Sequence, residues 1–321
     1  MTDSHNALVH HSIWGTHWMP AGDLEAAITE RLPEVQLDVA RTPSESATLI
    51  EDAEILLSSF AEPSLLDRAK NLEWIQAMSA GVDTLDLDDL RMRDVLLTSA
   101  AGAHAQPIAE QTLGYMLTFE RRLDDAIEMR RSGSWERFTG GELAGKTLGI
   151  VGLGEIGRRT ATFADAIGMD VLGSKRDTDV EIPGVDRIHP PDELESVLVE
   201  SDYLLVACPL TEETRGLIGR IELGVLPDQA VLLNVARGEV VEQEALVSAL
   251  QWGVIRGAAL DVFAQEPLPT DSPLWDLSNV LLTPHNAGVS PQLPDRTAEI
   301  FADNYELYAA GDLDALRNRV L

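Results

Sequence analysis

The sequence predicts an α/β fold, in which parallel strands alternate with helices that cross over the sheet. Three observations support this prediction. Short apolar runs typical of buried strands alternate along the chain with segments of helical spacing. A glycine-rich turn at residues 152–157 joins one such run to the start of a helix. The 321 residues are enough for two domains, each with its own core.

The first unit is predicted to be a small flavodoxin-like layer over residues 1–100, joined by the C-terminal residues 289–321. Ser44 is expected to cap its second helix, and Pro63 to open the third. The alternation of elements predicts parallel strands with crossover helices. The expected strands cover residues 7–13, 35–40, 54–58, 72–78 and 95–98, and the expected helices cover residues 23–32, 44–51, 63–70 and 295–310.

The second unit, residues 101–288, is predicted to be a doubly wound sheet of the Rossmann type. One long connecting helix is expected at residues 107–131, and Gly168 is expected to end the helix that follows the glycine turn. Ligands of such a sheet lie beyond the carboxyl ends of its strands. The first expected strand begins at residue 147, and the others cover residues 169–173, 202–208, 230–236, 257–262 and 280–283. Further helices are expected at residues 157–167, 191–200 and 243–251.

The glycine turn fits the pattern G-x-G-x-x-G that binds dinucleotides. Gly152 permits a tight turn, Gly154 lets the backbone approach a pyrophosphate, and Gly157 lets the helix pack closely on the strand. The pyrophosphate is expected on the N–H groups at the helix start, where Glu155 and Ile156 stand.

The composition restricts the partners of the chain. The net charge of −30 is spread along the sequence, and a surface of this sign repels nucleic acid and anionic lipid. Only three of the 24 basic residues are lysines, and this pattern resembles proteins of salt-loving microbes. No apolar run reaches the ~20 residues of a membrane span, no signal peptide is evident, and Cys208 has no cysteine to pair with. A cytoplasmic protein without membrane or nucleic-acid partners is expected.

Three polar residues stand just beyond the last predicted strands. They are Arg237, Glu266 and His285. An imidazole that titrates near neutral pH suits proton transfer, and a neighbouring carboxylate orients it and favours its protonated form. A guanidinium offers a fixed fork of donors for a carboxylate. Together, at strand ends on the ligand side of one sheet, these residues indicate a functional site.

With these residues in place, the chain resembles the D-isomer-specific 2-hydroxyacid dehydrogenase family. The resemblance covers essentially its whole length. The resemblance depends on the glycine turn and on four further stretches. These are residues 79–83 (Ser-Ala-Gly-Val-Asp), 234–238 (Asn-Val-Ala-Arg-Gly), 259–267 (Ala-Leu-Asp-Val-Phe-Ala-Gln-Glu-Pro) and 282–285 (Leu-Thr-Pro-His).

The resemblance implies an enzyme that reduces 2-oxo acids to D-2-hydroxy acids, and the reverse, with a nicotinamide cofactor. His285 is implied as the general acid/base, Glu266 as its partner and Arg237 as the substrate anchor. The backbone N–H groups of the loop Ser79, Ala80 and Gly81 are implied to hold the substrate carboxylate. Asp261 is implied to accept a bond from the nicotinamide carboxamide; read without the family, it is a turn or capping residue. Further cofactor contacts are implied for Cys208, Pro209, Thr214, Val235, Ala236, Ala287 and Gly288.

The residues after the second strand of this unit indicate which nicotinamide cofactor binds. An NAD enzyme of this fold usually has an acidic residue there, bound to the ribose 2′-hydroxyl. Here Ser174, Lys175 and Arg176 stand in that place, and they suit a 2′-phosphate. NADP(H) is therefore the predicted cofactor, with NAD(H) as the alternative if the strand extends to Asp177.

Several points stay open at the level of sequence. His104 stands where the family often has Asn, and Phe60, Met78 and Trp14 are candidates to face the substrate side chain. The alternative function is an NAD(H)-sensing corepressor, since some relatives of this fold act as transcriptional partners. The family is usually dimeric, so a homodimer is expected. No metal site is expected, because the histidines stand in no ligand spacing with a carboxylate.

Overall fold

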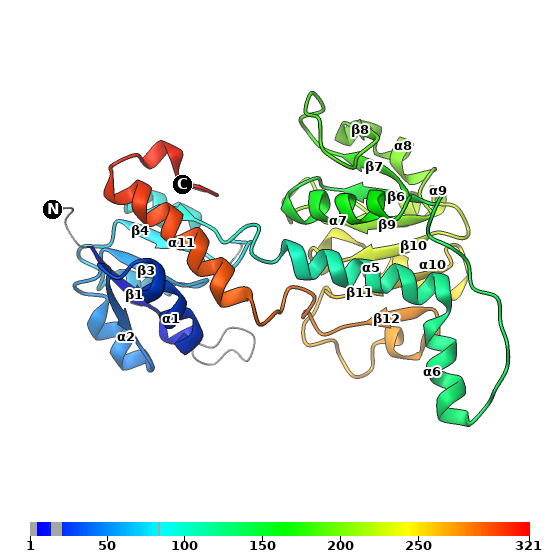
Figure 1. The fold of residues 1–321 in the computed structure, drawn as a ribbon, viewed down its shortest axis with the longest axis horizontal. Coiled ribbons are helices and arrows are strands. Elements are labelled where there is room, and N and C mark those ends of the chain that lie inside the picture. Colours follow the sequence, from blue (N-terminus) through cyan, green and yellow to red (C-terminus); the bar gives the residue numbers. More distant parts are fainter. Residues whose placement is uncertain (1–4, 14–20, 83) are drawn as a thin grey trace. The chain divides into compact units, whose positions relative to one another are not determined.

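The computed structural model describes residues 5–13, 21–82 and 84–321 (Figure 1). The chain divides into two compact units, Met1–His104 with Val289–Leu321, and Ala105–Gly288. Residues 101–104, assigned above to the second unit, thus belong to the first.

The first unit has one parallel sheet in the order β2-β1-β3-β4-β5. This is the flavodoxin-like order. Two of its helices, α1 and α11, share a core with the sheet although they are far apart in sequence. The strands are β1 (Asn6–Val9), β2 (Gln36–Val39), β3 (Ile55–Leu57), β4 (Trp74–Gln76) and β5 (Leu96–Thr98), and the helices are α1 (Ala21–Arg31), α2 (Pro43–Leu49), α3 (Pro63–Leu66), α4 (Leu87–Met92) and α11 (Leu293–Ala309).

The cap of α2 differs from the prediction. Thr42 is the N-cap, and its hydroxyl accepts a hydrogen bond from the N–H of Glu45 (3.2 Å). The Glu45 carboxylate in turn accepts the N–H of Arg41 (2.7 Å). Pro43 occupies the first helical turn, a position that proline favours, so Ser44 already lies inside the helix. The predicted first strand also ends early: residues 11–13 form a 3₁₀ turn.

The second unit has a seven-stranded parallel sheet in the order β12-β11-β10-β9-β6-β7-β8. The crossover after β8 returns the chain to the other side of β6, which is the Rossmann arrangement. Its strands are β6 (Thr147–Val151), β7 (Asp170–Ser174), β8 (Arg187–His189), β9 (Tyr203–Val206), β10 (Val231–Asn234), β11 (Gly257–Leu260) and β12 (Val280–Leu282), and its helices are α5 (Ala105–Arg121), α6 (Leu123–Ser132), α7 (Glu155–Ala166), α8 (Leu194–Leu198), α9 (Arg220–Val225) and α10 (Gln243–Gln251).

The single long helix predicted at 107–131 is wrong. It is two helices, because Arg122 adopts a left-handed conformation (φ 53°) that ends α5 and starts α6. The Arg122 guanidinium donates to the carboxylate of Asp125 (2.6 Å). Helix α5 has a buried face and lies alongside α7, whereas α6 has no buried residue and extends away from the rest of its unit (Figure 1).

Two elements of this unit were not predicted. Strand β8 is a short edge strand with the sequence Arg-Ile-His, so it offers no apolar run to detect. Helix α9 has only one buried residue, Leu223. Strand β8 follows from tertiary pairing, because its hydrogen bonds to β7 hold it in the sheet.

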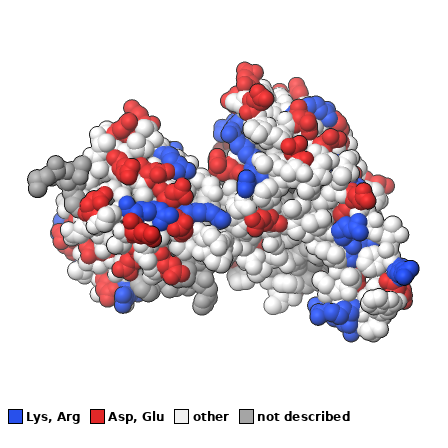
Figure 2. Space-filling view, in the orientation of Figure 1, with Lys and Arg blue, Asp and Glu red and all other residues white. Residues whose placement is uncertain are grey.

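Both faces of the Rossmann sheet are buried. Consecutive strand residues enter different core clusters: Leu204 and Leu232 belong to one, and Leu205 and Leu233 to the other. A doubly covered parallel sheet therefore explains why these strands read as unbroken apolar runs. None of the described helices is both long and apolar enough to cross a membrane. Acidic side chains are scattered over the visible face of both units (Figure 2).

Candidate active site

The glycine turn lies at the point where the order of the Rossmann sheet reverses. Gly152 follows β6 with φ 102°, and a Cβ there would lie 2.7 Å from backbone atoms of Cys208, which follows the neighbouring strand β9. A Cβ on Gly157 would lie 2.2 Å from the Gly152 carbonyl oxygen. Gly154, the N-cap of α7, has nothing within 4 Å of its Cβ position. The chain thus leaves space where a pyrophosphate would meet the helix start.

The predicted 2′-phosphate residues stand at the end of β7. Ser174 is the last residue of the strand and is buried. The Lys175 N–H donates to the carbonyl of His189 in β8 (3.0 Å), which fixes where the backbone leaves the sheet. Arg176 is exposed, and its charge helps to lower the pKa of Glu213, which is lowered mainly by a hydrogen bond from Thr211. Asp177 accepts the N–H of Asp179 (3.2 Å), so it closes its own turn.

The residues after β9 lie next to the glycine turn, where the Cys208 backbone adjoins Gly152. Burial raises the pKa of the Cys208 thiol to about 11, so the thiol stays protonated at neutral pH. Thr214 donates its hydroxyl to the carbonyl of Pro209 (2.6 Å) and accepts the N–H of Thr211 (2.7 Å). Thr214 therefore closes this loop.

The turn that presents Arg237 is built by Asn234. Its amide donates to the Arg237 carbonyl (3.0 Å) and accepts the N–H of Ala236 (3.1 Å). A Cβ on Gly238 would lie 1.9 Å from the backbone of Phe263, so only glycine fits where this turn touches the loop after β11. Val235 and Ala236, also predicted to contact cofactor, are buried. The Arg237 guanidinium donates to the Ala236 carbonyl (2.8 Å).

Glu266 and His285 are in contact. The Glu266 Oε2 lies 2.7 Å from the His285 Nδ1, and the Glu266 Oε1 accepts the N–H of Phe263 (3.0 Å). Both side chains are more than a third exposed. The carboxylate leaves the other ring nitrogen, Nε2, as the one able to act on a substrate. The Phe263 backbone touches Gly238, so the loops of Arg237 and Glu266 adjoin.

Asp261 accepts hydrogen bonds from the loop that carries His285. It is buried, with 2% of its surface exposed. Its two carboxylate oxygens accept the N–H groups of Asn286 and Ala287 (3.0 Å each), and Oδ1 also accepts the hydroxyl of Thr283 (2.5 Å). The side chain therefore shapes the turn, the role that it has without the family context. Ala287 is buried and Gly288 ends the unit.

The substrate loop predicted at 79–81 lies in the first unit, after β4. The Ser79 hydroxyl donates to the carbonyl of Gly81 (2.7 Å), and the Ser79 carbonyl accepts the N–H of Ala100 (2.9 Å). Ala80 is exposed and Gly81 half-buried.

The side chains proposed to face the substrate differ in how exposed they are. Met78 is fully buried in the core of the first unit, so that prediction is wrong. Phe60 is 40% exposed after β3, and Trp14 lies outside the described residues. His104 is half-buried at the boundary of its unit.

Two residues around His285 carried no prediction. Thr283 and Tyr115, the latter from α5, have hydroxyls in hydrogen-bond contact with each other. Tyr115 stands on the apolar face of a helix and reads as a core residue, so only the tertiary structure reveals this contact. Among the described residues no group of His, Cys, Asp or Glu is arranged to hold a metal ion.

The chain is similar to known proteins over its length. Residues 113–287 match the model of the family described as D-isomer specific 2-hydroxyacid dehydrogenase, NAD binding domain. A glyoxylate reductase of Thermofilum pendens is 38% identical over 268 residues, which cover 80% of this chain and 78% of the relative. A D-3-phosphoglycerate dehydrogenase of Methanocaldococcus jannaschii is 32% identical over 89% of this chain, and the match spans about half of that relative's length (55%).

A solved structure agrees with the fold. A D-isomer specific 2-hydroxyacid dehydrogenase from Xanthobacter autotrophicus Py2, in complex with NADPH and MES, superposes with a TM-score of 0.84. It is 29% identical, and the match covers 99% of this chain and 98% of that one. With the family model matching more than half of the residues and the relatives matching nearly all, the chain belongs to the D-isomer specific 2-hydroxyacid dehydrogenase family.

Proposed function

We propose that this protein reduces 2-oxo acids to D-2-hydroxy acids, and catalyses the reverse reaction, by hydride transfer from NAD(P)H. The observation that carries the proposal is the Glu266–His285 pair, 2.7 Å apart, on loops that adjoin the Arg237 turn. All three follow carboxyl ends of strands in a sheet whose glycine turn leaves space for a dinucleotide. From the resemblance we also propose that the backbone N–H groups of loop 79–81 bind the substrate carboxylate.

Each residue has a defined part in the reaction. A reduced nicotinamide, when bound, would supply the hydride to the carbonyl carbon. Arg237 holds the substrate carboxylate and draws electron density toward the carbonyl oxygen. His285 donates a proton from Nε2 to that oxygen as the alcohol forms, and Glu266 stabilises the imidazolium that is present before the transfer. In the reverse direction the neutral Nε2 accepts the hydroxyl proton.

NADP(H) is the proposed cofactor, and NAD(H) the alternative. Support comes from Lys175 and Arg176 at the end of β7, where an NAD enzyme of this fold has an acid. The nearest carboxylate along the chain, Asp177, is already bonded within its own turn. Two adjacent cations suit a phosphate better than a hydroxyl.

A substrate panel tests the function and the cofactor together. The protein is mixed with NADPH or NADH and with glyoxylate, hydroxypyruvate, pyruvate and branched 2-oxo acids, and loss of cofactor absorbance is followed. We expect turnover with at least one acid and a higher kcat/KM with NADPH. A preference for NADH would overturn the cofactor proposal. NADPH binding without turnover of any acid would instead favour the nucleotide-sensing alternative.

We also propose that the chain is adapted to high salt. A net charge of −30 with only three lysines gives strong self-repulsion, and molar salt shortens the Debye length to about 3 Å and screens it. We expect the melting temperature to rise between low and molar KCl. A melting curve that stays in place would contradict the proposal. We propose a cytoplasmic location for the protein.

A homodimer is proposed through α6 and the residues that follow it. Leu123 and Ile127 on this helix are 45% and 47% exposed, and Trp135 beyond it is 96% exposed. The helix extends away from its unit, and a second copy of the same surface would cover these side chains (Figure 1). Light scattering is expected to give the mass of two chains, and Ile127→Asp to lower it. A monomer mass for the wild type would rule this out.

A further inference from the structure

The turn that carries His285 is held in an uncommon backbone conformation. His285 has φ 52°, in the left-handed region that residues other than glycine seldom adopt. Its N–H donates to the carbonyl of Asp261 (2.8 Å), and the two following N–H groups donate to the Asp261 carboxylate. Such a conformation persists only where the surroundings determine it. Asp261 supplies these constraints through both its backbone and its side chain.

A chain of hydroxyls extends from Asp261 to helix α5. An ionised carboxylate only accepts hydrogen bonds, so the Thr283 hydroxyl donates its proton to Asp261 Oδ1. The Thr283 oxygen is therefore left to accept the proton of Tyr115, whose hydroxyl contacts it. A side-chain bond from Gln111, one turn earlier on α5, completes the chain at Tyr115.

The residues around these hydrogen-bonded hydroxyls hold them in place. Tyr115 is 4% exposed and Asp261 is 2% exposed. Burial raises the pKa of Tyr115, with a smaller contribution from the charge of Asp261, so its proton stays on the phenol at neutral pH. The hydroxyls of Tyr115 and Thr283 therefore both donate in the same direction, from α5 toward the Asp261 carboxylate.

We propose that Tyr115 and Thr283 are positioning residues for His285: through Asp261 they fix the turn that aims the imidazole and keeps its Nδ1 against Glu266. The proposal rests on the proposed function for its catalytic consequence. The hydroxyls of Tyr115 and Thr283 act through hydrogen bonds to other residues of this chain, and the last of these bonds ends at Asp261. Loss of the Thr283 hydroxyl removes a donor from Asp261, and loss of the Tyr115 hydroxyl leaves the Thr283 hydroxyl free to turn away from Asp261, so either loss loosens the turn.

The kinetic test uses variants that remove a hydroxyl with little change in shape. Tyr115→Phe and Thr283→Val are expected to lower kcat roughly 10-fold, the size typical of supporting residues around a site, with KM for the 2-oxo acid changed less than about twofold. Thr283→Ser restores the donor and is expected to recover most of kcat.

The matched control is Tyr203→Phe. It removes another buried tyrosine hydroxyl, which donates to the Glu120 carboxylate (2.7 Å) at the amino end of the strands of the same sheet. Its kcat is expected to stay within about twofold of wild type, since burial of a tyrosine is not by itself linked to His285.

A second measurement is independent of activity. The tautomer of His285 is read from the ¹⁵N shifts of labelled imidazoles, with its signals assigned by their loss in His285→Gln. A single Nδ1–H tautomer is expected in the neutral wild type and a mixture of both tautomers in Thr283→Val and Tyr115→Phe.

The two measurements separate the outcomes. Wild-type kcat together with an unchanged tautomer in both variants would overturn the positioning role. An inactive wild type would refute the proposed function alone, and the tautomer would still decide the positioning role. If Thr283→Val fails to fold, the comparison of Tyr115→Phe with Tyr203→Phe decides it.

Discussion

Replacing His285 with alanine is expected to lower kcat by about 10²–10⁴-fold, the usual effect of losing a general acid. Arg237 is proposed to hold the substrate carboxylate, so KM is expected to change much less. Steady-state kinetics with the best acid of the panel measure both values. His285→Asn is the second variant, because asparagine tolerates the left-handed conformation of this position (φ 52°) better than alanine.

The first unit supplies a matched control for this variant. His5 Nδ1 lies 2.6 Å from Glu54 Oε2, so the chain contains another His–Glu pair, at the amino end of the first unit's sheet. His5→Ala is expected to leave kcat within about twofold, since this pair lies in the other unit, at the amino end of its strand, whereas ligands of such sheets bind beyond the carboxyl ends. A near-normal kcat for both His285 variants would remove His285 from the mechanism.

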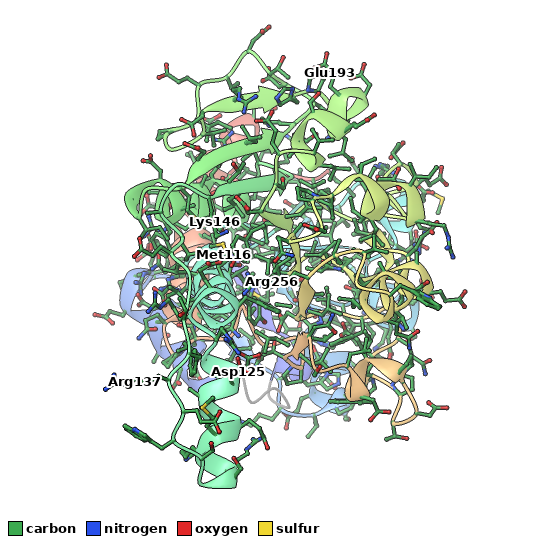
Figure 3. The ribbon with its side chains drawn as sticks, turned by 90° about the vertical axis from the view of Figure 1, so that its right-hand side faces the viewer. Met116, Asp125, Arg137, Lys146, Glu193 and Arg256 are labelled. Atoms are coloured by element: carbon green, nitrogen blue, oxygen red, sulfur yellow. The ribbon has the colours of Figure 1, made fainter. Side chains whose placement is uncertain are left out.

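Replacing Arg256 with methionine is expected to lower the free energy of unfolding of the second unit by about 3 kcal/mol, because it leaves a buried carboxylate poorly compensated. Glu120 is 5% exposed, and the Arg256 Nη1 lies 3.6 Å from its Oε2 while Lys146 lies 3.9 Å away. Figure 3 shows Lys146 and Arg256 beside α5, near Met116. Arg256 also donates to the carbonyl of Phe119 in α5 (2.6 Å).

Thermal unfolding checks this expectation. About 3 kcal/mol corresponds to a fall of about 6–12 °C for a unit of this size. Arg187→Met is the control: Arg187 pairs with Glu200 through two short bonds (2.9 and 2.6 Å), but both side chains are exposed, and surface pairs contribute about 1 kcal/mol or less. Adding Glu120→Gln to Arg256→Met is expected to recover part of the loss. Equal shifts for Arg256→Met and Arg187→Met would contradict the explanation by burial.

The buried carboxylate of Glu120 also keeps the neighbouring Tyr203 protonated. Burial and the neighbouring Glu120 raise the pKa of Tyr203 far above its ordinary value, so the phenol remains a donor to that carboxylate at all moderate pH. A Cβ on Gly141 would lie 1.7 Å from Glu120 Oε1, so the segment that returns from α6 passes directly over this group. The cluster thus joins α5, the returning segment and the amino edge of the sheet.

The sequence by itself determined the architecture and the residue types of the candidate site. Apolar runs such as Leu204–Val206 predict strands, because residues buried on both faces of a sheet need no alternation. The turn at 152–157 is predicted because only glycine fits a positive φ at Gly152 and the close contact at Gly157. Arg237, Glu266 and His285 are predicted as neighbours because parallel strands bring their carboxyl ends to one edge.

Only the tertiary structure decided how individual side chains are used. Arg122 breaks a segment whose helical spacing is continuous, and a left-handed residue leaves no trace in hydrophobic periodicity. Met78 is buried although it adjoins the predicted substrate loop. Asp261 binds the loop that carries His285, and Tyr115 contacts Thr283 across 168 positions of sequence. Such contacts depend on packing between distant segments, so local pattern predicts where a residue stands but not what it bonds to.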